Sequence, residues 1–132
     1  MSAGLLDTGV FIAAEVSRPL EPLPDRVAVS VVSLGELELG VLAAVDADVR
    51  ARRADTLALA RDADPIPISE AVMTAWAHLV HDCRQAGIHR SVRLTDALIA
   101  ATAVAHGLPV VTQDADFDRM ASAHAPLRVM KV

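Results

Sequence analysis

The stretch LTDALIAATAVAHGLPVVTQDADF, from Leu94 to Phe117, decides the fold of this chain. It is apolar and contains no helix breaker from Asp96 to His106, and Gly107 followed by Pro109 is typical of a helix end. We therefore expect a buried helix over residues 96–106. The sequence Pro-Val-Val-Thr that begins at Pro109 then predicts a short buried strand.

The lengths of this helix and strand bring three carboxylates together. A helix of about 11 residues and a strand of about five residues both span roughly 16 Å, so an antiparallel return places Asp114 level with Asp96. Asp116 follows just beyond the end of the strand. We expect the side chains of Asp96, Asp114 and Asp116 to meet at one edge of a sheet.

The composition favours one domain with an aliphatic core. The chain has 132 residues, and 53% of them are hydrophobic but only 2% aromatic. A core of Ala, Val, Leu and Ile suits helices packed on a parallel sheet. Residues 1–132 are expected to form one domain, because a chain of this length is typical of a single domain.

Charge and cysteine content narrow the class of protein. The net charge of −5 argues against a broad basic surface for nucleic acid, although all but one of the twelve basic residues are Arg, which binds phosphate well. The single Cys83 cannot form an internal disulfide. Because the N-terminus lacks the features of a signal peptide and no apolar run reaches about 18 residues, we expect a soluble cytoplasmic protein with no membrane segment.

Patterns of apolar residues and breakers predict alternating strands and helices along the chain. The expected strands are residues 4–7, 27–30, 66–68, 109–112 and 127–130, and the expected helices are residues 8–15, 31–45, 48–63, 69–86, 96–106 and 118–124. Right-handed crossovers make such strands parallel, so their carboxyl ends share one edge of the sheet.

Two more acids fall at this edge. Asp7 ends the first strand, and Glu36 lies one to two turns into the helix that follows the second strand. Open α/β sheets bind ligands at this edge, outside the carboxyl ends of the strands. Five carboxylates are therefore expected to converge there: Asp7, Glu36, Asp96, Asp114 and Asp116.

Helix capping is the alternative explanation for each acid taken singly. Asp7, Asp114 or Asp116 could cap a following helix, Asp96 could be a favourable charge in a first turn, and Ser33-x-x-Glu36 has the spacing of a capping box. Ser, Thr or Asn would cap as well as Asp, so capping alone does not select an all-acidic set. Crowded carboxylates repel one another unless a cation lies between them, and a hard cation such as Mg²⁺ or Mn²⁺ suits oxygen ligands.

Four motifs in order resemble the PIN-domain family, and more narrowly the VapC-type toxins of toxin–antitoxin pairs. They are Leu5-Leu6-Asp7-Thr8-Gly9, Ser33-Leu34-Gly35-Glu36-Leu37, Asp96-Ala97-Leu98-Ile99-Ala100-Ala101-Thr102-Ala103 and Val111-Thr112-Gln113-Asp114-Ala115-Asp116-Phe117. The resemblance covers the whole chain. It implies a three-layer α/β/α nuclease fold with a five-stranded parallel sheet of order 3-2-1-4-5.

The resemblance also implies an activity and partners. It implies an endoribonuclease toxin that depends on Mg²⁺ or Mn²⁺, with the metal held by Asp7, Glu36, Asp96, Asp114 and Asp116. Which of Asp114 and Asp116 binds the metal directly stays open, since many relatives differ around these positions. The implied partners are an RNA substrate, a second copy of the chain in a homodimer and a cognate antitoxin.

Weaker assignments follow from this reading. Thr8 and Thr112 could hydrogen-bond the metal ligands, and Arg90 and Arg93 could contact RNA phosphate. An amphipathic segment of the antitoxin is expected on apolar residues of the first two helices: Val10, Phe11, Ala14, Leu37 and Val41.

Two rival functions remain. The same fold could be a catalytically inactive module that binds RNA or protein, although loss of a carboxylate would favour that reading and none is missing. A phospho-accepting receiver also places Asp at strand ends, but it usually needs a Lys at that edge, and Lys131 is the only Lys in the chain.

Overall fold

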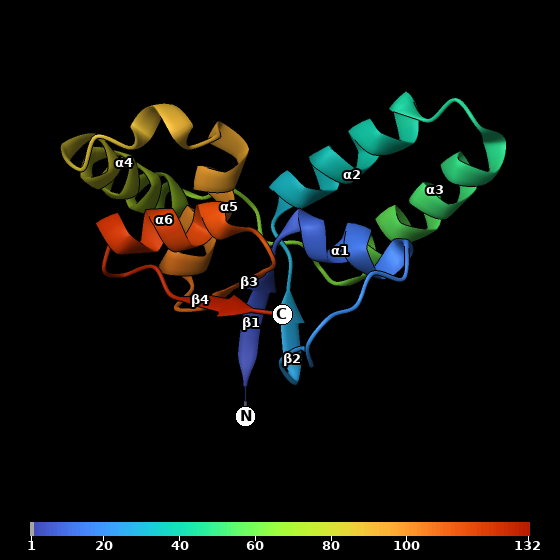
Figure 1. The fold of residues 1–132 in the computed structure, drawn as a ribbon, viewed down its shortest axis with the longest axis horizontal. Helices are drawn as coiled ribbons and strands as arrows, with labels where there is room; N and C mark the ends of the chain where they lie inside the picture. Colours follow the sequence, from blue (N-terminus) through green and yellow to red (C-terminus); the bar gives the residue numbers. More distant parts are fainter. Residues whose placement is uncertain (1) are drawn as a thin grey trace.

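The computed structural model describes residues 2–132 and contains a four-stranded parallel sheet between two sets of helices (Figure 1). The strand order is β2-β1-β3-β4. The strands are β1 (Ala3–Leu6), β2 (Arg26–Ala28), β3 (Val110–Thr112) and β4 (Val129–Lys131). The helices α1 (Thr8–Glu15), α2 (Val31–Ala43) and α3 (Ala47–Asp62) lie on one side of the sheet, and α4 (Glu70–Gln85), α5 (Leu94–Ala105) and α6 (Ala115–Ala123) lie on the other.

The expected third strand is reduced to one bridge, so the predicted count of five strands is wrong, whereas the other four strands keep their places in the predicted order 3-2-1-4-5. The N–H of Ile66 donates to the carbonyl of Val29 at 2.8 Å, and its carbonyl accepts from Val31 at 3.0 Å. Pro65 and Pro67 flank Ile66, and their missing N–H groups would point away from β2, as is typical of an edge position. The extended segment is short because Asp64 has a positive φ of 55° and Ser69 already caps α4. The single bridge lies on the β2 side, where the third strand was expected.

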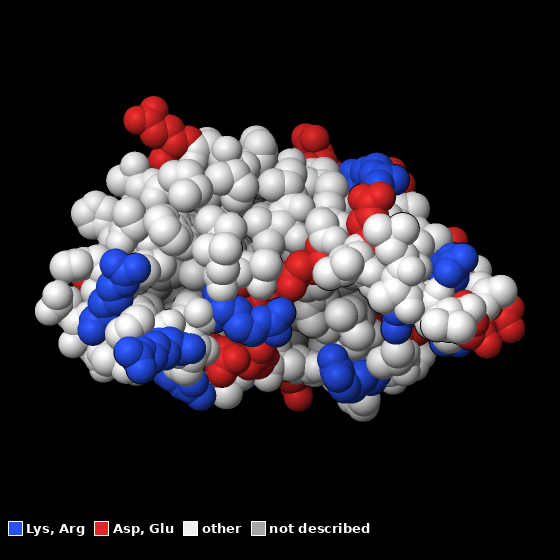
Figure 2. All heavy atoms as spheres, turned by 90° about the horizontal axis from the view of Figure 1, so that it is seen from above, with Lys and Arg blue, Asp and Glu red and all other residues white. Residues whose placement is uncertain are grey.

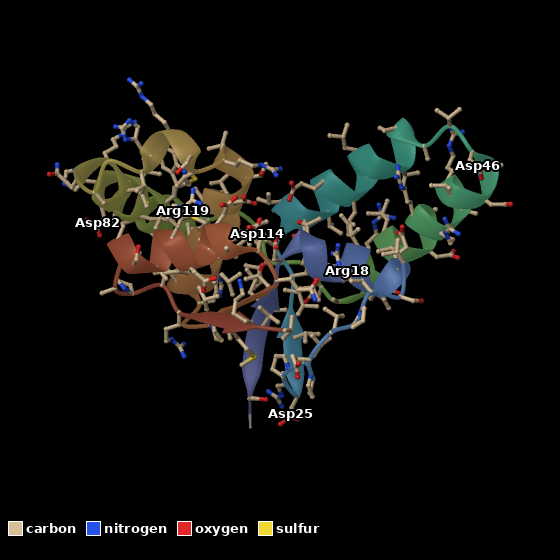
Figure 3. All side chains as sticks on the ribbon, in the orientation of Figure 1. Arg18, Asp25, Asp46, Asp82, Asp114 and Arg119 are labelled. Atoms are coloured by element: carbon tan, nitrogen blue, oxygen red, sulfur yellow. The ribbon has the colours of Figure 1, made fainter. Side chains whose placement is uncertain are left out.

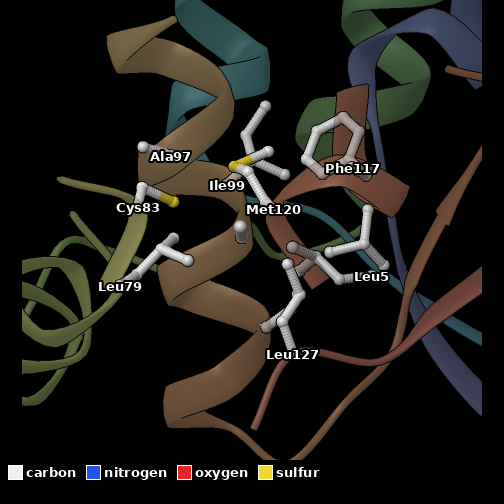
Figure 4. Close-up of a cluster of buried hydrophobic side chains, with 11 residues drawn as sticks. Leu5, Leu79, Cys83, Ala97, Ile99, Phe117, Met120 and Leu127 are labelled. Atoms are coloured by element: carbon white, nitrogen blue, oxygen red, sulfur yellow. The ribbon is translucent and has the colours of Figure 1, made fainter. Parts of the chain in front are cut away.

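Alternation along the strands divides the core into two clusters. Leu5 and Val110 face one side of the sheet, and Leu6 and Val111 face the other. The first pair packs with α4, α5 and α6 through residues that include Leu79, Ile99 and Phe117 (Figure 4). The second pair packs with α1, α2 and α3 through residues that include Val10, Phe11 and Leu37.

The ends of the helices follow local capping rules. The Ser30 and Ser69 hydroxyls accept hydrogen bonds in the first turns of α2 and α4. Gly87 and Gly107 adopt positive φ just after α4 and α5, as C-terminal glycines do. Helix α6 begins at Ala115, three residues earlier than expected, because the Asp114 carboxylate caps it.

None of the helices formed by residues 2–132 is long and apolar enough to cross a membrane.

Candidate metal centre

The candidate site lies beyond the carboxyl ends of the two central strands (Figure 3). Asp7 connects β1 to α1, and Asp114 connects β3 to α6. Because β1 and β3 are neighbours, these two connections lie side by side. The first turns of α5 and α6 supply Asp96 and Asp116 to the same region.

Three of the five predicted acids form a tight group. Asp96, Asp114 and Asp116 each offer one carboxylate oxygen, and these oxygens lie within 4.8 Å of one another. Asp96 is buried, Asp116 is half-buried and Asp114 is exposed. As expected, β3 returns antiparallel to α5 and so brings these three side chains together.

Asp7 lies close enough to this group for the charge of Asp114 to affect the pKa of its carboxyl. Burial raises the pKa of the Asp7 carboxyl, and the nearby charges of Asp114 and Glu36 raise it further. The Thr112 hydroxyl opposes this shift by donating a hydrogen bond to Asp7 Oδ2 at 2.9 Å. The same hydroxyl oxygen accepts from the N–H of Asp114 at 2.9 Å, so Thr112 links two of the acids.

Glu36 completes the set from the other side of the sheet. Its Oε1 accepts a hydrogen bond from the Thr8 hydroxyl at 2.7 Å, and its Oε2 lies 3.5 Å from the Arg93 guanidinium. Thr8 also lies 2.8 Å from the buried hydroxyl of Ser33. An ionised carboxylate can only accept, so the single proton of Thr8 goes to Glu36 and Ser33 donates to Thr8.

Asp96 has a buried carboxylate oxygen that lacks a hydrogen-bond partner among the described residues. Burial raises the pKa of its carboxyl to about 6; Arg93 lowers it, while Asp7, Glu36 and Asp114 raise it. The oxygen without a partner is Oδ2. An unpartnered carboxylate oxygen surrounded by other carboxylates is an oxygen donor set that fits a hard divalent cation.

The capping alternative explains part of this arrangement. The Asp114 carboxylate caps α6 through the N–H of Asp116 at 2.9 Å. Asp7 occupies the position before α1, but no capping hydrogen bond from its side chain is present within the described chain. Ser30 caps α2, so the capping box expected from Ser33 and Glu36 does not form.

The two arginines expected to contact RNA differ in position. Arg93 precedes α5 and lies against Glu36 with its side chain 67% exposed. Arg90 is exposed on the short 3₁₀ helix His89–Ser91. Of these two arginines, only Arg93 forms an ion pair with a carboxylate of the centre; Arg119, on α6, forms another with Asp116 at 3.5 Å.

Sequence reasoning missed Ser33 and Arg18. Ser33 has the position of a cap in the sequence, and its contact with Thr8 across 25 residues carries no local signal. Arg18 lies in the proline-containing loop after α1, yet it lines an open hollow of about 420 Å³ with Asp7, Gly9, Gln113 and Asp114. No spacing rule connects that loop to the carboxylates.

The apolar surface expected for a partner is mostly core. Val10, Phe11 and Leu37 are buried between the sheet and the helices α1, α2 and α3. Their neighbours Ile12 and Val16 are exposed instead. These two line a hollow of about 220 Å³ together with Glu15, Glu36, Leu37, Gly40 and Arg53, so this groove adjoins the acidic centre at Glu36. Val10, Phe11 and Ala14 line a different hollow of about 260 Å³.

Charged side chains of both signs adjoin near the middle of the face seen in Figure 2, whereas much of that face carries no charge. The acidic centre is therefore a local feature and not part of a uniformly charged surface.

Two ribonucleases of Mycobacterium tuberculosis are similar to this chain in sequence. Ribonuclease VapC8 of Mycobacterium tuberculosis (strain ATCC 25618 / H37Rv) is 64% identical over 103 residues, which cover 78% of this chain and 92% of VapC8. Ribonuclease VapC5 of the same strain is 44% identical over 133 residues, which cover 99% of this chain and 96% of VapC5.

A solved structure and a family match cover nearly all of the chain. The crystal structure of VapBC-5, a member of the VapBC family of toxin-antitoxin systems from Mycobacterium tuberculosis, superposes with a TM-score of 0.89 at 40% identity and covers all of both chains. Residues 4–123 match the PIN domain. The chain therefore belongs to the PIN-domain family.

Proposed function

We propose that this protein is a metal-dependent endoribonuclease, the toxin of a type II toxin–antitoxin pair, which hydrolyses RNA phosphodiester bonds and so inhibits translation or growth. The observation that carries the proposal is the group formed by Asp96, Asp114 and Asp116, in which the buried Oδ2 of Asp96 lacks a partner. The likeness to proteins named as VapC ribonucleases supports the same activity. We place this activity in the cytoplasm, within a single domain of residues 1–132.

The metal is proposed to be Mg²⁺ or Mn²⁺, because both prefer carboxylate and water oxygens. We assign its ligands to the five acids of the centre: Asp7, Glu36, Asp96, Asp114 and Asp116. Asp96 and Asp7 are the buried members, and burial of an ionised carboxylate is unfavourable unless a cation compensates it. A carboxylate oxygen of Asp116 lies within 4.8 Å of one from Asp114, so we include both residues among the proposed ligands.

When bound, a divalent cation stabilises the negative charge that develops on the phosphodiester and lowers the pKa of water toward neutrality. The protein supplies orientation. Thr112 holds the Asp7 carboxylate, and Thr8, held in turn by Ser33, fixes the Glu36 carboxylate. Such hydrogen bonds to metal ligands fix their geometry and basicity.

Substrate contacts are proposed for the exposed arginines beside the centre. Arg93 precedes Asp96 by three residues and offers the guanidinium donors that its ion pair with Glu36 leaves free. Arg90 extends the basic surface along the connection before α5. Guanidinium groups at these positions suit the phosphates of an RNA strand that approaches the carboxylates.

The proposed protein partners are a cognate antitoxin and a second copy of the chain. The structural neighbour described as part of a toxin-antitoxin system supports the first of these. The groove between α1, α2 and α3 offers exposed apolar side chains next to Glu15 and Glu36. An amphipathic segment with a cationic residue would match both properties.

RNA cleavage in the purified protein tests the proposal. Cleavage is expected to disappear in excess EDTA and to return with Mg²⁺ or Mn²⁺. Asp96→Asn should abolish it, whereas Asp118→Asn should not, because Asp118 lies on α6 but pairs with Lys131 away from the centre. Cleavage that persists in EDTA would refute metal dependence, and RNA binding without cleavage in any metal would favour the inactive module.

A further inference from the structure

Arg18 is held next to the carboxylates by the fold. Its own N–H donates to the carbonyl of Ala13 at 2.8 Å, and the preceding Ser17 adopts a positive φ of 56°. Gln113 Nε2 donates to the carbonyl of Pro19 at 2.9 Å. The loop that carries Arg18 is therefore tied to the segment that carries Asp114.

The guanidinium of Arg18 lines the hollow in front of two proposed metal ligands. The hollow is lined by Asp7, Gly9, Arg18, Gln113 and Asp114, and Figure 3 shows Arg18 and Asp114. Nevertheless, Arg18 makes no ion pair with any carboxylate of residues 2–132 at 4.0 Å or less. Its recorded hydrogen bond runs from Nη2 to the carbonyl of Gly9 and is long, at 3.4 Å.

Other arginines of the chain are engaged more firmly. Arg50 and Arg53 donate to the carbonyls of Ala44 and Gly40 at 2.6 Å and so bind the end of α2. Arg18 instead lies along the first turn of α1, where the helix dipole disfavours a cation. Neither helix capping nor a salt bridge therefore accounts for its position.

We propose that Arg18 binds a backbone phosphate of the RNA in this hollow, beside the phosphate that is cleaved. This inference rests on the proposed ribonuclease activity. The guanidinium has five donors in a planar fork that suits two phosphate oxygens, and its one long hydrogen bond leaves most of them free. Arg18 lies beside Asp7 and Asp114, whereas Arg93 and Arg119 are paired with Glu36 and Asp116.

The test compares Arg18→Gln with Arg26→Gln. Arg26 is a matched control because it is an exposed arginine that begins β2, at the opposite edge of the sheet from the carboxylates. Binding of a short fluorescent single-stranded oligoribonucleotide is measured by anisotropy in Ca²⁺, with gels to verify that the RNA stays intact. Thermal melting verifies that each variant is folded.

Arg18→Gln should weaken RNA binding by about tenfold or more, as expected for loss of a hydrogen bond to a charged group. The slope of log affinity against log salt should fall by about 0.7, the contribution of one phosphate contact to a single strand. Arg26→Gln should change neither quantity. Arg18→Lys should keep the salt slope but lose part of the affinity, and it decides the question if Arg18→Gln does not fold.

An Arg18→Gln protein that binds RNA like Arg26→Gln would overturn the inference while leaving the ribonuclease proposal intact. A variant that loses antitoxin binding but keeps its RNA affinity would also overturn it, because the hollow would then belong to the protein partner. A wild-type protein that neither binds nor cleaves RNA would overturn both proposals.

Discussion

The ionised Asp96 lowers the free energy of unfolding of the metal-free protein, whereas an exposed acid in the first turn of a helix would raise it. The residue is 6% exposed, and the pKa of its carboxyl is raised to about 6 from an ordinary value of 3.8, with burial as the largest cause. A raised carboxyl pKa means that the folded state holds the proton more tightly than the unfolded state. This loss of stability is therefore complete above about pH 6 and disappears as the pH falls toward 3.8.

Asp96→Asn should make the metal-free protein more stable at pH 7.5. The expected gain is about 1–3 kcal/mol, because the substitution removes the cost of ionising a buried carboxyl. Near pH 4 the gain should be small, since Asp96 is then mostly protonated in the folded protein. Urea unfolding in EDTA at the two pH values measures both quantities.

Metal should change the difference in stability between the wild type and Asp96→Asn in the opposite direction. Mn²⁺ should stabilise the wild type by about 2.7 kcal/mol at a concentration one hundred times its dissociation constant, and it should stabilise Asp96→Asn much less. Asp118→Asn serves as the control that keeps the full response to Mn²⁺. An Asp96→Asn protein that is less stable than wild type in EDTA and responds equally to Mn²⁺ would show that Asp96 is only a first-turn charge.

Thr112 offers a second prediction at the scale of a single side chain. Thr112→Val keeps the shape of the side chain but leaves the Asp7 carboxylate and the Asp114 N–H without their shared partner. Loss of these buried bonds should cost about 1–3 kcal/mol and weaken Mn²⁺ binding about tenfold or more. Calorimetric titration with Mn²⁺ and thermal melting test this, and Thr112→Ser, which retains the hydroxyl, should stay close to wild type in both.

At the scale of elements, Asp114 caps α6 and is also one of the proposed metal ligands. The Asp114 carboxylate accepts from the N–H of Asp116 and also faces Asp96. Both Asp114→Ser and Asp114→Ala remove the repulsion of Asp7 and Asp96, but only Asp114→Ser preserves the cap, so Asp114→Ala should be less stable than Asp114→Ser by about 1 kcal/mol in the metal-free protein. Both variants should lose most of their Mn²⁺ binding and RNA cleavage, because both lack the charge.

Urea unfolding in EDTA separates these two roles of Asp114. If Asp114→Ser retains metal binding like the wild type, the carboxylate is a cap alone. If Asp114→Ser and Asp114→Ala are equally stable, the hydrogen bond to Asp116 contributes little to α6.

The sequence allows the elements around the carboxylates to be predicted because their signals are local. The apolar run of α5 and the glycine at its end decide the geometry that brings Asp96 and Asp114 together. The third strand was overestimated, since the positive φ of Asp64 and the start of α4 after Ser69 leave only a short extended segment, in which Ile66 forms a single bridge. The pairing of Ser33 with Thr8 and the approach of Arg18 to Asp114 could not be predicted, because each joins distant segments through tertiary packing.

At the scale of the whole molecule, the two helical layers meet above the sheet (Figure 1), and Asp114 of the acidic centre lies at this junction (Figure 3). Asp96 and Asp116 come from helices that pack on one face of the sheet, and Glu36 comes from a helix on the other face. Few apolar contacts can join the two helical layers, because the side chain of each strand residue faces only one of them. A cation held by acids from both layers would therefore connect them as well as take part in catalysis.

The groove that leads to Glu36 gives the last prediction. Val16 is 56% exposed and lines this groove, whereas Val45 is 98% exposed on the connection between α2 and α3. Val16→Asp should weaken antitoxin binding about tenfold or more, because it places a charge where an apolar side chain of the partner would be buried. Val45→Asp should bind the antitoxin like the wild type.

Calorimetry with the purified antitoxin measures these affinities, and RNA cleavage with and without antitoxin reports the consequence. Val16→Asp should cleave RNA at close to the wild-type rate, since its side chain is outside the carboxylate group, yet it should resist inhibition by the antitoxin. A Val16→Asp protein that the antitoxin still inhibits at wild-type concentrations would place the partner elsewhere. Because both variants add the same charge at an exposed valine, a difference between them can be assigned to the groove and not to net charge.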